Sequence, residues 1–136
     1  MSIPDDILAL ARTAAQAASD KLAGEVIGLD VSELVVITDV FLVCSGSSER
    51  QVSAIVDGIE EQLLKEHRRK PLRREGQMDA RWVLLDYGDI VIHVQHAEDR
   101  AFYALERLWR EAPVLDLQID EGGPAAPAGS DSSSAA

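Results

Sequence analysis

The sequence predicts an α/β fold built on a mixed β-sheet, and three patterns indicate it. Two stretches carry apolar residues at the three- and four-residue spacing of amphipathic helices, at 3–24 and 49–67. Apolar runs of strand length stand between and after these helices, at 25–29, 41–45 and 82–95. The helix at 49–67 is long enough for a crossover, so the strands before and after it are expected to lie parallel. A hairpin within 82–95 adds antiparallel pairing, which makes the predicted sheet mixed.

With 136 residues and 46% hydrophobic content, the chain is expected to form a single domain. We place this domain at residues 1–112 and expect an acidic Pro/Ala/Ser-rich tail at 113–136 that is largely disordered. The single Cys44 excludes an internal disulfide, and no apolar run approaches the roughly 18 residues that cross a bilayer, so no membrane partner is expected. The N-terminus is acidic, which argues against a signal peptide, so we expect a cytoplasmic protein.

The first helix is predicted to begin near Pro4, with Ser2 as its cap and acidic residues in its first turn. Gly24 is expected to end it. Its apolar stripe is mostly alanine, whose small side chain lets a helix approach a sheet closely. The stripe comprises Ile7, Ala11, Ala14, Ala15, Ala18 and Leu22. Residues 25–29 follow as a short strand.

A central strand at 41–45 leads into the second helix, and Cys44 within it is interpreted as inert packing. Ser48 followed by Gln51 matches a capping box, which satisfies exposed N–H groups at the start of a helix. The buried stripe of this helix is predicted to comprise Val52, Ile55, Val56, Ile59 and Leu63. The loop before it, with Arg50 in the first turn, could instead hold an anion, but it lacks the glycine and lysine spacing of a phosphate-binding loop.

A basic corner follows the second helix. Residues 65–81 hold seven cations and three acids, a local net charge of +4. Because the whole chain has a net charge of −11, the remaining residues have a net charge of −15. This segregation fits an acidic body that docks on a basic protein while one edge lies near phosphate. A solvated charged loop is the alternative interpretation. The candidate RNA-proximal residues are Arg68, Arg69, Lys70 and Arg73. A strand is predicted at 71–75.

The run at 82–95 is predicted to form a hairpin with Tyr87-Gly88 as its two-residue loop, because glycine suits the positive φ of a tight turn. This loop would pair Asp86 with Asp89 and Trp82 with His93 across the ladder. One face would carry core residues only, namely Val83, Leu85, Ile90, Ile92 and Val94. The other face would carry Trp82, Leu84, Asp86, Asp89, Val91, His93 and Gln95. A third helix is expected from residue 97 to Pro113.

The second hairpin face is interpreted as a surface that binds a partner. Trp82 is the expected anchor, because aromatic residues dominate interface energies, and Asp86 and Asp89 are the expected acceptors for a partner's Lys or Arg. Tyr87 and His93 are further candidates. The alternatives are that Trp82 belongs to the core and that the two aspartates cap the turn.

Two other classes of function stay open at this point. Gly46-Ser47 superficially resembles the start of a nucleotidyltransferase site, with Asp86 and Asp89 as the nearest metal-binding acids. Together with His93 and His96, these acids have no recognised metal spacing, so we predict no metal, no cofactor and no catalytic residue. The remaining alternative is a plain dimerisation module.

Several sequence blocks, in order along the chain, resemble the ribosomal silencing factor family, also called RsfS or Iojap. The blocks are Ile37-Thr38-Asp39-Val40-Phe41, Ser45-Gly46-Ser47-Ser48, Pro71-Leu72-Arg73, Trp82-Val83-Leu84-Leu85-Asp86-Tyr87-Gly88-Asp89 and Arg100-Ala101-Phe102-Tyr103-Ala104-Leu105-Glu106. The resemblance covers nearly all of the predicted domain, and the block that begins at Trp82 is the most specific.

The resemblance implies a non-enzymatic repressor of translation. Members bind the large ribosomal subunit through its ribosomal protein fourteen and block joining of the small subunit when nutrients are scarce. The family resemblance implies a mixed five-stranded sheet with helices, related to the nucleotidyltransferase fold but without its catalytic acids. It also implies a homodimer when the factor is free. The docking candidates, Trp82 foremost, would then face the ribosome.

Overall fold

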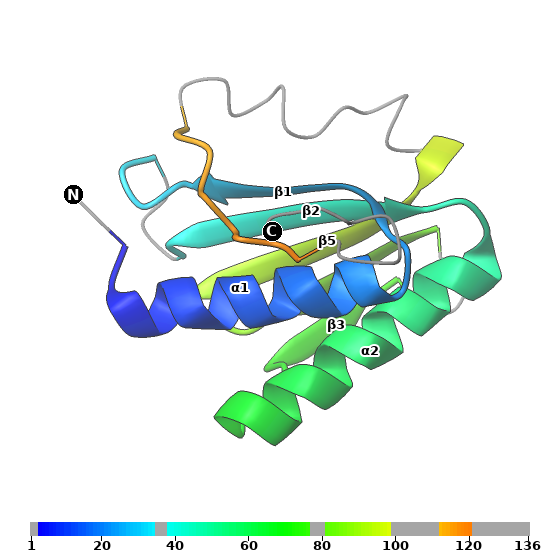
Figure 1. Cartoon of the computed structure of the whole chain (residues 1–136), viewed down its shortest axis with the longest axis horizontal. Helices are drawn as coiled ribbons and strands as arrows, with labels where there is room; N and C mark the ends of the chain where they lie inside the picture. Colours follow the sequence, from blue (N-terminus) through cyan, green and yellow to red (C-terminus); the bar gives the residue numbers. More distant parts are fainter. Residues whose placement is uncertain (1–2, 35–37, 77–80, 99–111, 121–136) are drawn as a thin grey trace.

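The computed structural model describes residues 3–34, 38–76, 81–98 and 112–120, and its sheet has both described helices on one face (Figure 1). Five strands follow the order β1-β2-β5-β4-β3. Their bounds are β1 Gly24–Asp30, β2 Val40–Gly46, β3 Arg73–Glu75, β4 Trp82–Asp86 and β5 Ile90–His96. β2 and β5 are parallel, and the other neighbouring strands are antiparallel. The predicted α/β fold with a mixed five-stranded sheet is therefore confirmed.

Helix α1 (Asp5–Asp20) ends earlier than predicted. Leu22 adopts a left-handed backbone conformation with φ of 65°, and Gly24 is already the first residue of β1. The turn carries Leu22 away from the apolar stripe, so its side chain is 81% exposed rather than buried. Pro4 occupies the N-cap position without a side-chain hydrogen bond, and the predicted Ser2 cap lies outside the described residues.

Helix α2 (Glu49–His67) has the predicted bounds and the predicted cap. Ser48 Oγ accepts a hydrogen bond from the Gln51 backbone N–H at 3.1 Å. The Gln51 side chain differs from a capping box, because its Oε1 accepts from the Ser47 N–H at 2.6 Å. Its Nε2 donates to the carbonyls of Lys21 and Leu22, at 3.1 and 3.0 Å, and ties the start of α2 to the end of α1. These contacts favour capping over anion binding at this loop.

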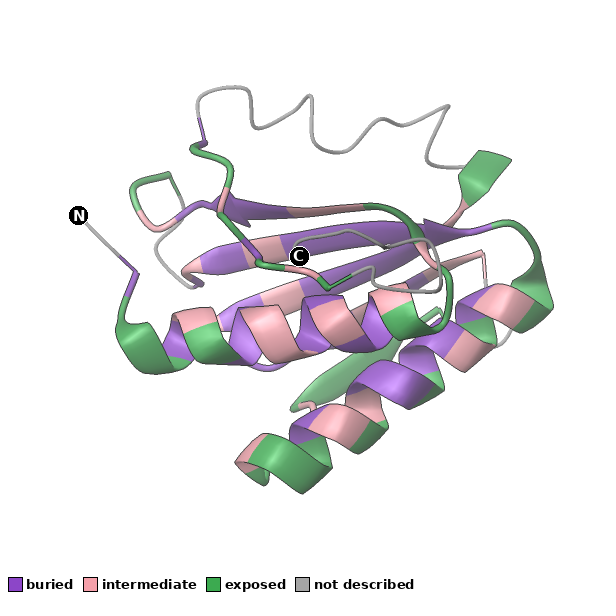
Figure 2. Cartoon of the chain, in the orientation of Figure 1, coloured by how far each residue is buried: buried purple, intermediate pink, exposed green. Residues whose placement is uncertain are grey.

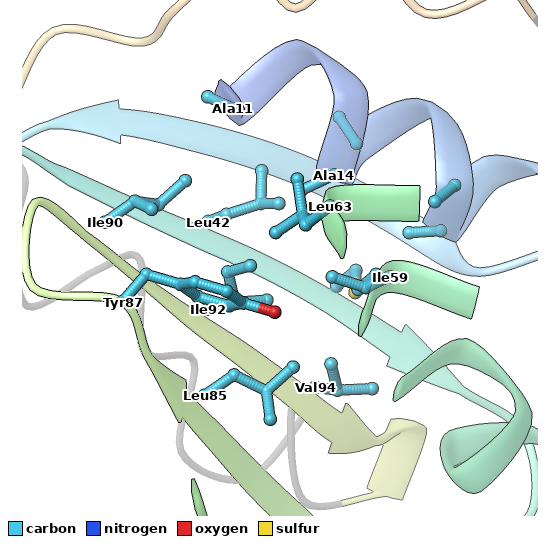
Figure 3. Packing of buried hydrophobic residues seen from close by; sticks show 14 of the residues in the cluster. Ala11, Ala14, Leu42, Ile59, Leu63, Leu85, Tyr87, Ile90, Ile92 and Val94 are labelled. Atoms are coloured by element: carbon cyan, nitrogen blue, oxygen red, sulfur yellow. The ribbon is translucent and has the colours of Figure 1, made fainter. Parts of the chain in front are cut away.

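The main core lies between the sheet and the two helices (Figure 2). Ala11 and Ala14 of α1 are fully buried, which confirms the close-packing role predicted for the alanine stripe. The five residues predicted as the α2 stripe are also buried. Figure 3 shows Ile59 and Leu63 of α2 beside Leu42 and Ile92 of the sheet. Cys44 is buried in this cluster, as predicted for a packing residue.

Residues 112–120 pack against the sheet and α1. Val114 forms an isolated bridge with Leu29 of β1, and Leu117 belongs to the main core. Ordered contacts therefore continue past the boundary predicted at residue 112. The predicted third helix, apart from Ala97 and Glu98, and the tail beyond Asp120 lie outside the described residues. Neither α1 nor α2 is both long and apolar enough to span a membrane.

Candidate docking surface

The β4–β5 hairpin positions the predicted docking residues, and its loop differs from the prediction by one residue. The Tyr87 N–H donates to the Ile90 carbonyl at 2.9 Å, so the two-residue loop is Gly88-Asp89 rather than Tyr87-Gly88. Gly88 takes the positive φ, 91°, at the first loop position. The observed pairs are therefore Trp82 with Gln95, Val83 with Val94, Leu84 with His93, Leu85 with Ile92, and Asp86 with Val91.

This change moves every cross-strand partner by two residues, so the two faces stay as predicted. The core face of the hairpin is buried beneath the helices. On the outer face, Trp82, Leu84, Asp86 and Val91 are partly exposed, whereas His93 and Gln95 are buried. The predicted opposition of two carboxylates is wrong, because Asp86 faces Val91 and Asp89 lies in the loop.

An aromatic cluster on the outer face joins three strands. Trp82 Nε1–H donates to His93 Nδ1 at 3.2 Å, and the two ring centroids are 6.2 Å apart. The ring of Phe41, from β2, lies 5.0 Å from the His93 ring. An indole nitrogen can only donate a hydrogen bond, so Nδ1 of the neutral imidazole is the acceptor and its proton is on Nε2. Trp82 is thus held in place from below by His93.

Burial lowers the pKa of His93 to about 4, so the imidazole is neutral at pH 7. Its Nε2 atom is buried and has no hydrogen-bond partner among the described residues. The amide of Gln95, which is fully buried two residues further along β5, is also without a partner at both of its polar atoms. Unsatisfied buried polar groups are costly in a stable core. This part of the outer face therefore retains hydrogen-bonding capacity that the described residues do not use.

The two aspartates at the hairpin tip are engaged within the chain. Asp86 Oδ1 accepts from the Gly88 N–H at 2.8 Å, which is the turn-capping role foreseen for it. Its other oxygen lies 3.7 Å from Arg73, whose side chain is 66% exposed. Asp89 forms a closer pair with Arg69, with Oδ1 at 2.9 Å and Oδ2 at 3.4 Å. A partner's cation would have to compete with Arg73 at Asp86 and with the two-pronged Arg69 at Asp89.

Tyr87 does not reach the outer surface. Its side chain is 2% exposed and points into the core between Leu85 and Ile59 (Figure 3). Burial raises the pKa of the phenol, with the Glu60 carboxylate as the second cause, and the hydroxyl has no hydrogen-bond partner in the part of the chain that the structure describes. Tyr87 was expected as a further partner contact, but the one-residue change in the loop places its side chain in the core-facing ladder, so we do not include it in the docking surface.

The basic corner divides into two sets of cations. Arg69, Arg73 and Arg74 pair with carboxylates of the same chain, and so does Arg81, the residue before β4. The second set comprises Lys65, Arg68 and Lys70, which are exposed and form no ion pair with the residues that the structure describes. Of the four predicted RNA-proximal residues, Arg68 and Lys70 thus present unpaired charge, and Arg69 and Arg73 do not.

The residues of the enzymatic alternative lie at opposite ends of the sheet. Gly46 pairs with His96 at one end of the β2–β5 ladder, whereas Val40 pairs with Ile90, next to Asp89, at the other. Six residues of strand separate the ends, which is about 20 Å at about 3.3 Å per residue. Acids at that distance cannot hold a metal beside Gly46-Ser47. No group of three potential ligands capable of holding a metal occurs in the part of the chain that the structure describes.

The sequence did not predict that Phe41 belongs to the aromatic cluster, or that Arg69 forms an ion pair with Asp89 at the hairpin tip. Phe41 lies on a neighbouring strand, so only the parallel β2–β5 register brings it to His93. The ladder alternation already placed Phe41, Val43 and Ser45 on one face of β2, which is the signal that could have identified it. Arg69 was assigned to RNA because its partner, Asp89, is twenty residues away in the sequence.

Comparison with known proteins identifies the family of this fold. The family model described as "Ribosomal silencing factor during starvation" matches residues 4–136. A Bacillus subtilis protein named ribosomal silencing factor RsfS is 42% identical over 108 residues, covering 79% of this chain and 91% of the relative. A crystal structure from Bacillus halodurans is 39% identical with a TM-score of 0.68, covering 83% of this chain and 99% of that one. One from Chromobacterium violaceum is 30% identical with a TM-score of 0.71, covering 87% and 97%. The chain therefore belongs to the ribosomal silencing factor family.

Proposed function

We propose that this protein is a translational repressor that binds the large ribosomal subunit in the cytoplasm. It does so through ribosomal protein fourteen of that subunit and blocks joining of the small subunit when nutrients are limiting. Family membership supports the ribosomal role. The observation that carries the docking surface is the Trp82–His93–Phe41 cluster on the face of the sheet opposite α1 and α2.

Trp82 is the proposed anchor of this contact. It is partly exposed, and its indole N–H is already bonded to His93, so the ring presents its apolar surface without an unsatisfied donor. Aromatic side chains fixed in this way lose little conformational freedom on binding, which favours them as interface hot spots. His93 acts beneath Trp82 as the group that orients it, rather than as a direct contact.

Asp86 is the better of the two proposed acceptors for a basic partner. Its contact with Arg73 is long, 3.7 Å, and exposed ion pairs of this kind contribute about 0–1 kcal/mol. An incoming Lys or Arg can therefore replace Arg73 at little cost. Asp89 is held by two contacts with Arg69, which also donates to the Tyr87 carbonyl at 2.8 Å. We assign Asp89 a secondary role.

Subunit joining tests the proposal directly. Purified protein is added to isolated small and large subunits, and the joined ribosome is quantified on a sucrose gradient. Joining should fall as the protein saturates the large subunit, and undiminished joining at saturation would refute repression. Trp82→Ala should raise the concentration for half-inhibition at least tenfold, whereas Leu64→Ala, at an exposed position on α2, should not.

A charge reversal tests the acidic contact separately. Asp86→Lys should weaken inhibition, and Asp57→Lys, an exposed acid of α2, provides a control with the same change in net charge. Equal effects of the two variants would point to general electrostatics instead of a contact at Asp86. Circular dichroism of Asp86→Lys is needed beside the assay, because Asp86 also caps the turn at Gly88.

The ribosomal RNA contact is proposed to rest on Arg68 and Lys70. Within the described part of the chain their charges have no ion-pair partner, unlike those of Arg69 and Arg73. If both meet phosphates, replacing them with glutamine should make the dependence of subunit affinity on salt shallower by about 1.5 in a double-logarithmic plot. Arg50→Gln, an exposed cation at the other end of α2, should leave the slope unchanged.

The free protein is proposed to form a homodimer through the same outer face. A partly exposed aromatic cluster is the kind of surface that self-association buries. One apolar patch would then serve a second copy and the ribosome in turn. A dimer locked by a cross-link should bind large subunits much more weakly than the free protein, and equal binding would place the two interfaces on different surfaces.

A further inference from the structure

The last described segment, residues 113–120, occupies a groove between β1 and α1. In Figure 1 it passes over β1 and ends beside α1. On the strand side, the Asp30 N–H donates to the Pro113 carbonyl and the Leu115 N–H donates to the Gly28 carbonyl, both at 2.8 Å. These two bonds flank the bridge between Leu29 and Val114. The segment therefore begins as a short added strand at the edge of β1.

Two side chains of helix α1 form hydrogen bonds with the backbone of the same segment. Arg12 Nε donates to the Asp116 carbonyl at 3.0 Å. Gln16 uses both ends of its amide on one residue, donating to the Asp120 carbonyl at 2.9 Å and accepting from the Asp120 N–H at 2.7 Å. All of these contacts are to main-chain atoms. Recognition of an extended chain through its main chain is the principle of β-strand addition, in which backbone hydrogen bonds give affinity and pockets for alternate side chains give specificity.

Alternate side chains of the segment supply the apolar contacts. Leu115, Leu117 and Ile119 pack against the main core, while Val114 between Pro113 and Leu115 is 71% exposed. Leu117 is 7% exposed, and Gly28 makes room for it. A Cβ atom on Gly28 would lie 3.0 Å from Leu117 Cδ2. The groove thus accepts aliphatic residues at every second position.

The chain's own segment leaves space at one end of this groove. Beside Ile119 lies a hollow of about 510 Å³ that is open to solvent and is lined by Ser19, Leu22, Ala23, Glu25 and Val26. The sequence after Asp120 contains no large apolar side chain that could enter it. Gln118 has a φ of 53°, a left-handed conformation that suits glycine better than glutamine. A different peptide could therefore bind more tightly than the resident one.

We propose that this groove is a binding site for an extended peptide segment of a partner protein, with aliphatic residues at alternate positions, and that residues 113–120 are its displaceable occupant. Because residues 113–120 belong to the same chain as the groove, their effective concentration there is in the millimolar range or above. Weak ligands therefore cannot displace them. A competitor that buries about half of a leucine side chain in this open hollow should gain up to about tenfold in affinity. The groove lies between β1 and α1, whereas the Trp82–His93–Phe41 cluster lies on the outer face of the sheet, and the two adjoin where Phe41 packs against Leu29 and Ala112. Direct peptide binding, measured without ribosomes, tests the groove separately from ribosome docking.

Fluorescence polarisation with a labelled peptide of sequence Ala-Pro-Val-Leu-Asp-Leu-Gln-Ile-Asp, that of residues 112–120, tests the site on the full chain. The double variant Leu115→Asp/Leu117→Asp should release the resident segment and bind the peptide saturably, at least tenfold more tightly than the unaltered chain does. Adding Gly28→Val should abolish this binding. Val114→Asp, at an exposed position of the same segment, should behave like the unaltered chain, and a scrambled peptide should not bind.

A second measurement uses the unaltered chain, in case the double variant does not fold. A peptide with glycine in place of Gln118 and an added C-terminal leucine is supplied in excess, and hydrogen exchange of the Leu115 amide is followed by NMR. Faster exchange with saturating peptide supports displacement. Unchanged exchange at millimolar peptide, or no saturable binding by a folded double variant, would overturn the proposal.

Discussion

Acidification should destabilise this protein through His93. Burial holds the pKa of this imidazole at about 4 in the folded state, against about 6.5 when the chain is unfolded. The unfolded state therefore binds more protons between these values, so stability is fully present above about pH 6.5 and is lost as the pH falls toward 4. At about 1.4 kcal/mol for each pH unit, the loss between pH 7 and pH 4 is about 3 kcal/mol.

The free energy of unfolding, from urea denaturation followed by circular dichroism at pH 7, 5.5 and 4, measures this loss. Other carboxyl groups titrate in the same range, so His93→Gln is the reference, because glutamine gains no proton. The unaltered chain should lose about 3 kcal/mol more than the variant, with about half of that difference present by pH 5.5. Parallel losses in the two proteins, or an NMR titration that places the His93 pKa near 6.5, would refute the reasoning.

The same protonation should also release Trp82. A protonated imidazole carries a hydrogen on each nitrogen, so Nδ1 no longer accepts from the Trp82 indole N–H. The anchor of the proposed docking surface would then lose the contact that orients it. Inhibition of subunit joining should weaken at acidic pH in the unaltered chain, in step with the titration of His93.

Three further substitutions have outcomes that follow from the structure. Tyr87→Phe removes a buried hydroxyl that has no hydrogen-bond partner among the described residues, so the free energy of unfolding, measured in urea, should stay equal or rise. A decrease of more than about 2 kcal/mol would show that the hydroxyl forms a hydrogen bond in the folded state. Gly76→Ala should lower the melting temperature by several degrees, because φ is 86° and the added Cβ would collide with the Trp82 carbonyl oxygen. Arg69→Gln leaves Asp89 without its ion pair and should cost about 1–3 kcal/mol, with faster amide exchange in the hairpin loop; unchanged exchange would show that the ion pair does not hold the loop.

The proposed groove for residues 113–120 and the outer face of the sheet lie at different places in the fold. The first is built by β1 and α1, and the second by β2, β4 and β5. The two sites adjoin, because Phe41 of the outer face also packs against the cluster of Leu29, Val31 and Ala112, where the segment begins. Measuring subunit joining with the competitor peptide present would show whether the two sites are coupled.

Local periodicity in the sequence determined much of the fold. Helical spacing and capping chemistry predicted the bounds of α2, its Ser48 cap and its buried stripe. Both signals arise between residues that are only three or four positions apart. The two faces of the hairpin follow from the period of two in a strand, and they survived a wrong loop because the pairing moved by two residues. Trp82 and His93 share a face as predicted for this reason, but the predicted direct pairing of the two is wrong, because Trp82 pairs with Gln95.

Only the tertiary structure decided what depends on long-range contacts. The hydrogen bond that fixes the loop placed Tyr87 in the core, and the proximity of α2 to the hairpin tip paired Arg69 with Asp89. The apolar run at 114–119 is visible in the sequence, but its packing against β1 and α1 is not. Nothing in the sequence around Gly28, Arg12 and Gln16 indicates that these residues contact it. Contacts between residues about 20 to 100 positions apart leave no periodic trace, so the chain had to fold before they could be identified.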